Sequence, residues 1–351
     1  MRLIIDDISH DSSKLESLSE QLIQSDQHWH QDVGRLLKEW RSDEQAITMT
    51  TSGSTGRPKH ISHLKSAMRD SAEKTGSYFD LSTGTTALAC LPYTFIAGKM
   101  MIIRAMVLGW DLIISKPSSN PLRDLDQRID FIALTPHQLS HILEENPDKL
   151  QFVEKILLGG GPVSPSLQTQ IYSLNNQIFI GYGMTETITH IAVKRLNGTA
   201  ASDVYQALPG ISFQQSKDGS LIISADHLPD TLFTTDIVKL YSTTSFIWVG
   251  RMDNIINSGG IKVYPEKIER QLSAYIQYPF FVYGVPDDLL GERVELFIEA
   301  NESDEVSDIS QHFDGFTGAE RPRQVHHCTK FTYTNTGKIR RKETVMQTLK
   351  T

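Results

Sequence analysis

Short apolar runs alternate with helical patterns through the first two-thirds of the chain. Strands are predicted at 45–50, 86–93, 111–115, 131–136, 155–160 and 177–183, and helices at 64–79, 100–109, 137–145 and 165–174. Strand–helix alternation of this kind is typical of a largely parallel sheet covered by helices, which makes the fold class α/β. Ligands bind such sheets at the carboxyl ends of the strands.

The pattern changes after residue 220. Residues 221–225, 232–242 and 245–251 form β-like runs, and then a helix at 265–273, strands at 280–285 and 293–300, and a basic end that turns helical predict a small α+β unit. We place the boundary near Asp253, which gives domains 1–252 and 253–351. No flexible linker lies there, so we expect a short joint that can act as a hinge.

Composition and charge narrow the class of protein. Lys and Arg number 34 against 42 Asp and Glu, so the net charge of −8 argues against nucleic acid or an anionic membrane as the main partner. The most apolar region, 87–115, is interrupted by Pro92, Lys99 and Arg104, which favours a buried strand, helix and strand over a membrane span. The start of the chain has no signal-peptide pattern, and Cys90 and Cys328 are far apart. A soluble, cytoplasmic protein is expected.

The segment 51–59, "TSGSTGRPK", concentrates glycine and hydroxyl side chains before Lys59. Backbone N–H groups in such a loop can point at one anion, and Lys59 adds a full charge. The order Gly56-Arg57-Pro58-Lys59 does not match the P-loop of kinases. From these residues alone, the segment can be either a phosphate-binding loop or an ordinary polar surface loop.

A second segment, "GYGMTETITHIA" at 181–192, combines several ligand-binding features. Glycines allow close backbone approach, Tyr182 offers a face for stacking, Thr185 offers a hydroxyl, and Glu186 offers a hard oxygen for Mg²⁺. A strand–turn–helix corner with an incidental acid explains the segment equally well.

Two further segments carry isolated charged candidates. Asp236 can accept hydrogen bonds from ribose hydroxyls with Arg251 beside it, although each is more often a surface ion-pair partner. Lys338 follows a glycine near the basic end and can reach another domain, although a solvated helix start is the usual explanation. No Ser–His–Asp order, cysteine nucleophile motif or zinc spacing stands out.

Taken together and in this order, "TTSGSTGRPK", "GYGMTET", "TTDIV…WVGRMDNIINSGGIKVYPEKIE" and "TNTGKIRRK" resemble the adenylate-forming superfamily of acyl- and aryl-CoA synthetases. The resemblance covers about residues 45–345. It implies a large N-terminal domain with a small mobile C-terminal lid. It also implies a carboxylic acid, ATP, Mg²⁺ and CoA as reactants: the acid attacks the α-phosphate of ATP, and a thiol then displaces AMP.

The resemblance also implies roles for individual residues. The phosphates of ATP would be held by Thr51, Ser52, Gly53, Ser54, Thr55, Gly56 and Lys59, and the adenine side would be lined by Gly160, Gly161, Pro162, Tyr182, Gly183 and Met184. Thr185 would touch the α-phosphate, Glu186 would hold Mg²⁺, and Asp236 and Arg251 would bind ribose. Lys338 would act in adenylation, Asp253 would be the hinge, and Ser258, Gly259 and Gly260 would line the path of CoA.

The chain departs from the family pattern in three places. Only about fifty residues precede Thr51, so part of the usual N-terminal domain is expected to be missing. Phe95 stands where a histidine is common, and Thr332 and Tyr333 replace the usual proline and arginine of the final motif. None of the charged motif residues is lost.

Within the superfamily, the short chain and "GMTETITHIA" most resemble the o-succinylbenzoate–CoA ligases of menaquinone biosynthesis. That acid has an aromatic ring and two carboxylates, so its pocket needs a cation beside apolar walls. The candidate pocket residues are Phe95, Arg104, Thr135, Thr189 and His190, with Arg104 or His190 as partner of the distal carboxylate. Two alternatives remain. One is another acyl- or aryl-adenylating ligase or an enzyme that loads a carrier protein, and the other is a catalytically silent nucleotide-binding regulator. The oligomeric state is open, a homo-oligomer included.

Overall fold

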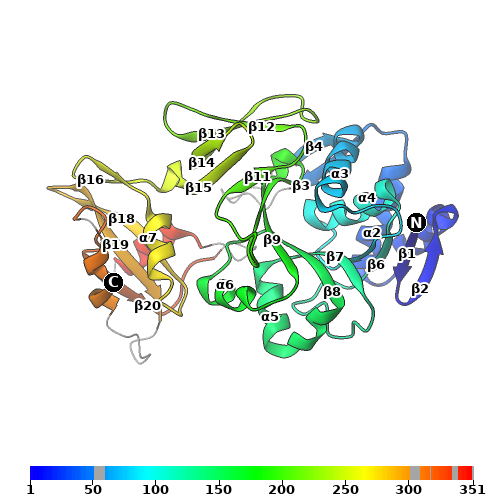
Figure 1. Cartoon of the computed structure of the whole chain (residues 1–351), viewed down its shortest axis with the longest axis horizontal. Helices are drawn as coiled ribbons and strands as arrows, with labels where there is room; N and C mark the ends of the chain where they lie inside the picture. The colour runs from blue at the N-terminus through cyan, green and yellow to red at the C-terminus, as the bar shows by residue number, and fades with distance from the viewer. Residues whose placement is uncertain (51–59, 301–308, 317, 334–338, 350–351) are drawn as a thin grey trace.

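The computed structural model describes residues 1–50, 60–300, 309–316, 318–333 and 339–349. Figure 1 shows a larger part, from the N-terminus to β15, and a smaller part that contains the C-terminus. In the described part of the chain, each has its own sheet and its own buried cores.

One sheet runs through the larger part. Its 13 described strands follow the order β12-β13-β14-β15-β11-β10-β9-β8-β7-β5-β6-β1-β2. Their bounds are β1 (Arg2–Ile5), β2 (Ile8–Asp11), β5 (Thr86–Ala89), β6 (Asp111–Ile114), β7 (Ile129–Leu134), β8 (Val153–Leu158), β9 (Gln177–Gly183), β10 (His190–Arg195), β11 (Tyr205–Ala207), β12 (Ile211–Gln215), β13 (Ser220–Ala225), β14 (Leu232–Ser242) and β15 (Ser245–Arg251). Strands β1, β6, β5, β7, β8 and β9 are parallel to one another, and the remaining pairings are antiparallel.

Helices cover both faces of the parallel strands, as predicted. They are α1 (Leu15–Ile23), α2 (His28–Arg41), α3 (Lys65–Phe79), α4 (Ile96–Leu108), α5 (Pro136–Glu145) and α6 (Pro165–Tyr172). Successive residues of β7 point to opposite faces: Phe131 joins the core that contains α3 and α4, whereas Ile132 joins the core that contains α5 and α6. The strands are therefore apolar on both sides, which is why they read as continuous hydrophobic runs.

The predicted strand at 45–50 forms, but its place in the parallel sheet was wrong. It is β3 (Ala46–Thr50), which pairs antiparallel with β4 (His60–Leu64) in a separate two-stranded sheet. An apolar run fixes the type of element but not its pairing partner. The segment that takes an outer place in the parallel sheet is β1, near the N-terminus.

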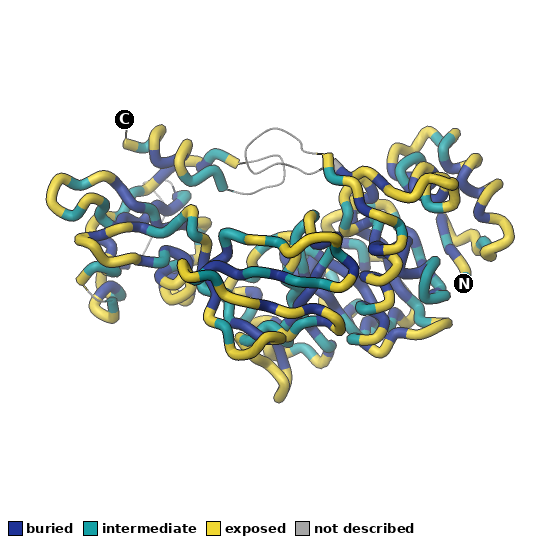
Figure 2. Tube along the Cα trace, turned by 90° about the horizontal axis from the view of Figure 1, so that it is seen from above, coloured by how far each residue is buried: buried dark blue, intermediate teal, exposed yellow. Residues whose placement is uncertain are grey.

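The smaller part is α+β. It contains β16 (Ile256–Ser258), β17 (Ile261–Val263), α7 (Pro265–Leu272), β18 (Phe280–Asp287), β19 (Gly291–Glu299), β20 (Gln324–Cys328) and α8 (Arg341–Thr348). Short 3₁₀ helices lie at Ser12–Lys14, Pro147–Phe152, Thr185–Thr187, Met252–Asn254 and Ile309–Gly315. Figure 2 shows buried segments running through both parts. Among the described residues, no helix is both long and apolar enough to cross a membrane.

Candidate active site

The carboxyl ends of β7, β8 and β9 place several predicted residues at one edge of the sheet. Thr135 follows β7 and caps α5, Gly160 and Gly161 follow β8, and Tyr182 lies near the end of β9. The backbone N–H of Gly159 donates to the carbonyl of Leu134 at 3.0 Å, which joins the first two turns. Parallel pairing therefore brings together segments that are far apart in sequence.

The glycines after β8 leave their surroundings open. A Cβ added to Gly159 or Gly161 would meet no atom within 4 Å, and Gly160 has a φ of +82°, in the left-handed region that favours glycine. Pro162 is exposed beside them. Backbone that is both exposed and free of side chains lets a flat ligand approach closely, which fits the predicted adenine side.

Asp236 is buried and receives two hydrogen bonds from aromatic side chains. The Tyr182 hydroxyl donates to Oδ2 at 2.7 Å, and the Trp248 indole Nε1 donates to Oδ1 at 3.1 Å. Burial, and then the Asp236 charge, raise the pKa of Tyr182, so its proton stays on the phenol. Two donors fix the direction of the Asp236 carboxylate, with lone pairs left over for a further donor.

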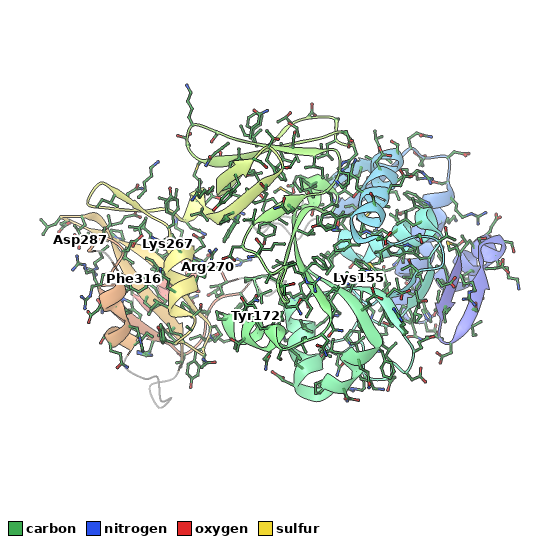
Figure 3. All side chains as sticks on the ribbon, viewed as in Figure 1. Lys155, Tyr172, Lys267, Arg270, Asp287 and Phe316 are labelled. Atoms are coloured by element: carbon green, nitrogen blue, oxygen red, sulfur yellow. The ribbon has the colours of Figure 1, made fainter. Side chains whose placement is uncertain are left out.

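Arg251 lies opposite Asp236 in the β14–β15 pairing and reaches the joint between the two parts. Its Nη2 donates to Thr235 Oγ1 at 2.7 Å and to Asp253 Oδ2 at 2.9 Å. On the other side of the joint, Glu266 Oε1 accepts from Asn254 Nδ2. Figure 3 labels Arg270 on α7, where its Nη2 donates to the carbonyl oxygen of Trp248 at 3.4 Å.

The segment after β9 folds tightly around one hydroxyl. Thr187 is fully buried, and its Oγ1 accepts from the Met184 backbone N–H at 2.9 Å while lying 2.8 Å from the Thr189 carbonyl oxygen. The next residue, Ile188, has a φ of +66°, a strained conformation for a β-branched side chain. This compact turn leaves Glu186 exposed and Thr185 half-exposed at its surface.

Gly183 is held against the same turn by close packing. A Cβ there would lie 2.3 Å from the Thr189 carbonyl oxygen, so only glycine fits. A single accessible carboxylate such as Glu186 suits Mg²⁺, which keeps several waters and takes one or two protein carboxylates together with substrate phosphates.

Arg104 is the most unusual charged residue of the region. It lies on α4 with 2% of its surface exposed, and its Nη2 donates to Thr189 Oγ1 at 3.0 Å. Its Nε has no hydrogen-bond partner, and within the described part of the chain Arg104 pairs with no carboxylate. Burial lowers the pKa of Arg104 to about 9, which reflects the cost of an uncompensated cation.

His190 lies next to Arg104 and is buried as well. Its Nδ1 is 3.3 Å from Thr189 Oγ1, and its Nε2 has no hydrogen-bond partner. Burial, and then the Arg104 charge, hold the pKa of His190 well below its usual range, so the ring is neutral. Arg104 and His190, both buried, and the half-buried Thr189 therefore form one polar group with unused hydrogen-bonding capacity, which we call the Arg104 cluster.

Other predicted residues lie apart from these groups. Phe95 is the N-cap of α4 and is 43% exposed, so the structure does not bury it in the Arg104 cluster. Ser258 ends β16, and Gly259 and Gly260 form the turn to β17 in the smaller part. Residues 51–59, with Thr51, Ser52, Gly53, Ser54, Thr55, Gly56 and Lys59, lie outside the described residues, as does Lys338.

Sequence reasoning missed Trp248 and His63. Trp248 becomes a partner of Asp236 through the strand pairing of β14 and β15, which a motif does not reveal. His63 on β4 is buried beside the backbone of Thr185 and the Glu186 charge, and burial lowers its pKa. Its place after "GRPKHIS" was the only available signal, and a lone histidine is usually a core residue.

Comparison with known proteins identifies the family of the chain, and the arrangement of the candidate active site is compatible with that family. The chain belongs to the family of AMP-binding enzymes, which matches residues 4–213. This finding confirms the prediction of an adenylate-forming enzyme, and the relatives below support an AMP-forming CoA ligase.

Among curated proteins, the chain is 24% identical to a 2-succinylbenzoate–CoA ligase of Staphylococcus epidermidis over 85% of its length and 69% of the relative. It is 26% identical to the corresponding ligase of Staphylococcus aureus, over 85% of this chain and 66% of that one. The chain thus spans about two-thirds of the length of these relatives.

Two solved structures are informative about the fold. An acyl-CoA synthetase (AMP-forming)/AMP-acid ligase II-like protein from Dyadobacter fermentans is 34% identical, with a TM-score of 0.64 over 95% of this chain and 98% of that one. The o-succinylbenzoate CoA synthetase of Bacillus subtilis, solved with ATP and magnesium, is 19% identical, with a TM-score of 0.73 over 86% of this chain and 70% of that one. Both support the predicted adenylate-forming fold.

Proposed function

We propose that the protein is an ATP-dependent acid–CoA ligase that activates o-succinylbenzoate through an acyl-adenylate. The observation that carries the choice of acid is the Arg104 cluster. A buried guanidinium without a carboxylate partner is costly in the free protein, and an anionic ligand removes that cost. The names of the curated relatives point to the same acid.

The apolar neighbours of Arg104 support a small aromatic dicarboxylate over a fatty acid. Arg104 lies among apolar neighbours, because buried methionine and isoleucine residues precede it on α4 and buried Ala105 follows it. One cation within an apolar environment suits a ring that bears a second carboxylate. In this proposal Arg104 binds the distal carboxylate, Thr189 and His190 orient it, and Thr135 and Phe95 line the entry.

The nucleotide would occupy the carboxyl edge of the sheet. Gly160, Gly161, Pro162 and Tyr182 would face adenine, with Gly183 and Met184 below it, and Asp236 and Arg251 would bind ribose. Glu186 would hold Mg²⁺, which neutralises phosphate charge when it is bound. Thr185 would contact the α-phosphate, and residues 51–56 with Lys59 would hold the remaining phosphates.

The smaller part would act as the lid, with domains 1–252 and 253–351. Lys338 would bridge the carboxylate and the α-phosphate during adenylation, and rotation at Asp253 would then bring Ser258, Gly259 and Gly260 to the path of CoA. Asp253 already contacts Arg251 and Thr235, so the hinge and the ribose site share residues.

Acid-dependent ATP–pyrophosphate exchange tests the proposal. We expect exchange with o-succinylbenzoate, little with benzoate or hexadecanoate, and thioester only when CoA is added. Exchange with another acid alone would retain the mechanism and reject the substrate. AMP binding without exchange for any acid would instead favour the silent regulator.

A further inference from the structure

A cavity of about 270 Å³ lies near the N-terminus, between the β1–β2 hairpin and helices α1 and α2. Its apolar lining comes from Ile5, Ile8, Leu18 and Leu22. Its polar lining comes from Asp6, His10, Gln21, Ser25 and His30. None of these residues belongs to the proposed nucleotide or acid site.

Three of these polar residues, Asp6, His30 and Ser25, contact one another in a way that can activate the serine. Ser25 Oγ lies 2.8 Å from His30 Nδ1, and Asp6 Oδ2 lies 3.0 Å from His30 Nε2. A carboxylate beside Nε2 favours the tautomer that carries its proton there. Nδ1 is then free to accept the Ser25 hydroxyl proton, so nucleophile, base and acid are in contact as in hydrolases, with the two imidazole nitrogens exchanged.

The surroundings hold this arrangement in place. His30 is 6% exposed, and its ring packs on Trp29 at 3.9 Å between centroids. Nε2 is buried and lies 3.0 Å from Asp6 Oδ2 without making a hydrogen bond to it, so Asp6 acts on the ring through its charge. The Gln31 side chain donates to the Ser25 carbonyl oxygen at 2.8 Å, which fixes the serine backbone.

The backbone of the β1–β2 turn and the start of α2 also favour a reactive serine at this site. Asp6 has a φ of +49° and the next residue one of +63°, both in the left-handed region, so the tight hairpin turn fixes the position of Asp6. Ser25 lies three residues before α2, whose first-turn N–H groups have no acceptor within the helix. Such groups favour negative charge that develops near the serine.

We propose that Ser25 is the nucleophile of a second, acyl-accepting site, with His30 as its base and Asp6 as a positioning residue. The substrate class is a small uncharged ester, because the cavity is small and four apolar side chains line it beside the polar residues. Ser25 Oγ attacks the carbonyl carbon, its proton moves to His30 Nδ1, and the C–O bond to the alcohol breaks as His30 returns the proton to it. Water then cleaves the acyl-serine by the same route and releases the acid.

An organophosphorus fluoride tests the site on the intact protein. Attack by Ser25 forms an Oγ–P bond and releases fluoride, and peptide mass mapping locates the adduct. We expect labelling at Ser25, slowed about 100-fold in His30→Gln and about tenfold in Asp6→Asn. Ser17→Ala, which removes an exposed hydroxyl on α1, is the matched control and should label at the wild-type rate.

Either of two results would overturn the proposal. One is labelling of Ser25 no faster than that of Ser17, and the other is an unchanged rate in both His30→Gln and Asp6→Asn. Circular dichroism confirms that each variant is folded, and Asp6, at 56% side-chain exposure, is the substitution least able to unfold the chain. ATP–pyrophosphate exchange should be unaffected in every variant, so the two proposals fail independently.

Discussion

At the scale of single residues, Arg104 shows a conflict between stability and binding. An unpaired buried guanidinium destabilises the free protein, and buried charges are often replaced by apolar residues with a gain in stability. The protein nevertheless keeps Arg104 with only Thr189 and the Met101 sulfur as hydrogen-bond partners in the described chain. A ligand carboxylate would supply the hydrogen-bond acceptor and the negative charge that Arg104 lacks.

We expect Arg104→Met to raise the KM for o-succinylbenzoate by about 100-fold, because a buried charged hydrogen-bond partner contributes several kcal/mol to binding. The midpoint of thermal unfolding should stay the same or rise, since methionine fills similar space without a charge. Steady-state kinetics and calorimetry measure the two effects. Met101→Leu is the control, and an unchanged KM for Arg104→Met would remove Arg104 from the acid pocket.

At the scale of elements, the Met184–Thr189 turn depends on Thr187. One hydroxyl bonds backbone groups on both sides of the strained Ile188, so it fixes the direction in which Thr185 and Glu186 face. The turn is therefore held by a side chain that itself touches no predicted ligand.

Thr187→Val keeps the shape but leaves buried backbone groups unsatisfied, which costs about 1–3 kcal/mol. We expect ATP–pyrophosphate exchange to fall at least tenfold, whereas Thr187→Ser, which keeps the hydroxyl, should stay within about threefold of wild type. Exchange rates at saturating ATP give the comparison. Equal activity of Thr187→Val and Thr187→Ser would show that the turn does not need this bond.

The sequence predicted most elements of the parallel region, because apolar runs bounded by glycines identify buried strands. It could not place β3 outside the sheet, since pairing partners depend on contacts far along the chain. For the same reason the sequence pointed to Asp236 but not to its partner Trp248. It also pointed to Arg104 and His190, but it could not show that both are buried. No Ser–His–Asp motif was visible in the sequence, because Asp6, Ser25 and His30 come together only when the β1–β2 hairpin folds next to α2.

At the scale of the whole molecule, several buried histidines link stability to pH. Burial lowers the pKa of His63, His190 and His227. The unfolded chain binds protons at the ordinary histidine pKa of about 6.5, whereas these folded histidines bind them only at lower pH. Their contribution is complete above about pH 6.5 and is lost as the pH falls below it.

His190→Gln should therefore flatten the acid side of the stability profile. Between about pH 6.5 and pH 5.5, the free energy of unfolding of the wild type should fall by up to about 1.4 kcal/mol more than that of the variant. Urea denaturation at each pH measures it. The raised pKa of Glu269, caused first by burial, acts in the opposite direction but equally in both proteins. Parallel profiles would show that His190 is already charged in the folded state.

Lys338 tests the division of labour between the two parts, which rests on the proposed function. Lys338→Ala should lose acid-dependent pyrophosphate exchange by about 100-fold or more, because a positioned cation stabilises the charge that develops at the α-phosphate. It should still convert supplied acyl-adenylate and CoA to thioester. Lys330→Ala, an exposed lysine of the same part, is the control. Equal loss of both steps would contradict the assigned role.

The hydrogen bond between Trp248 and Asp236 also gives the protein an optical reporter. Indole emission shifts with the charge and hydration around its N–H group, and this N–H points at the carboxylate proposed to hold ribose. Nucleotide entry would therefore change the fluorescence of Trp248 without any attached dye. Trp29 and Trp110 lie in the core, Trp40 packs against it, and the three would supply a constant background. Titration of the native protein could then follow occupancy and turnover in real time.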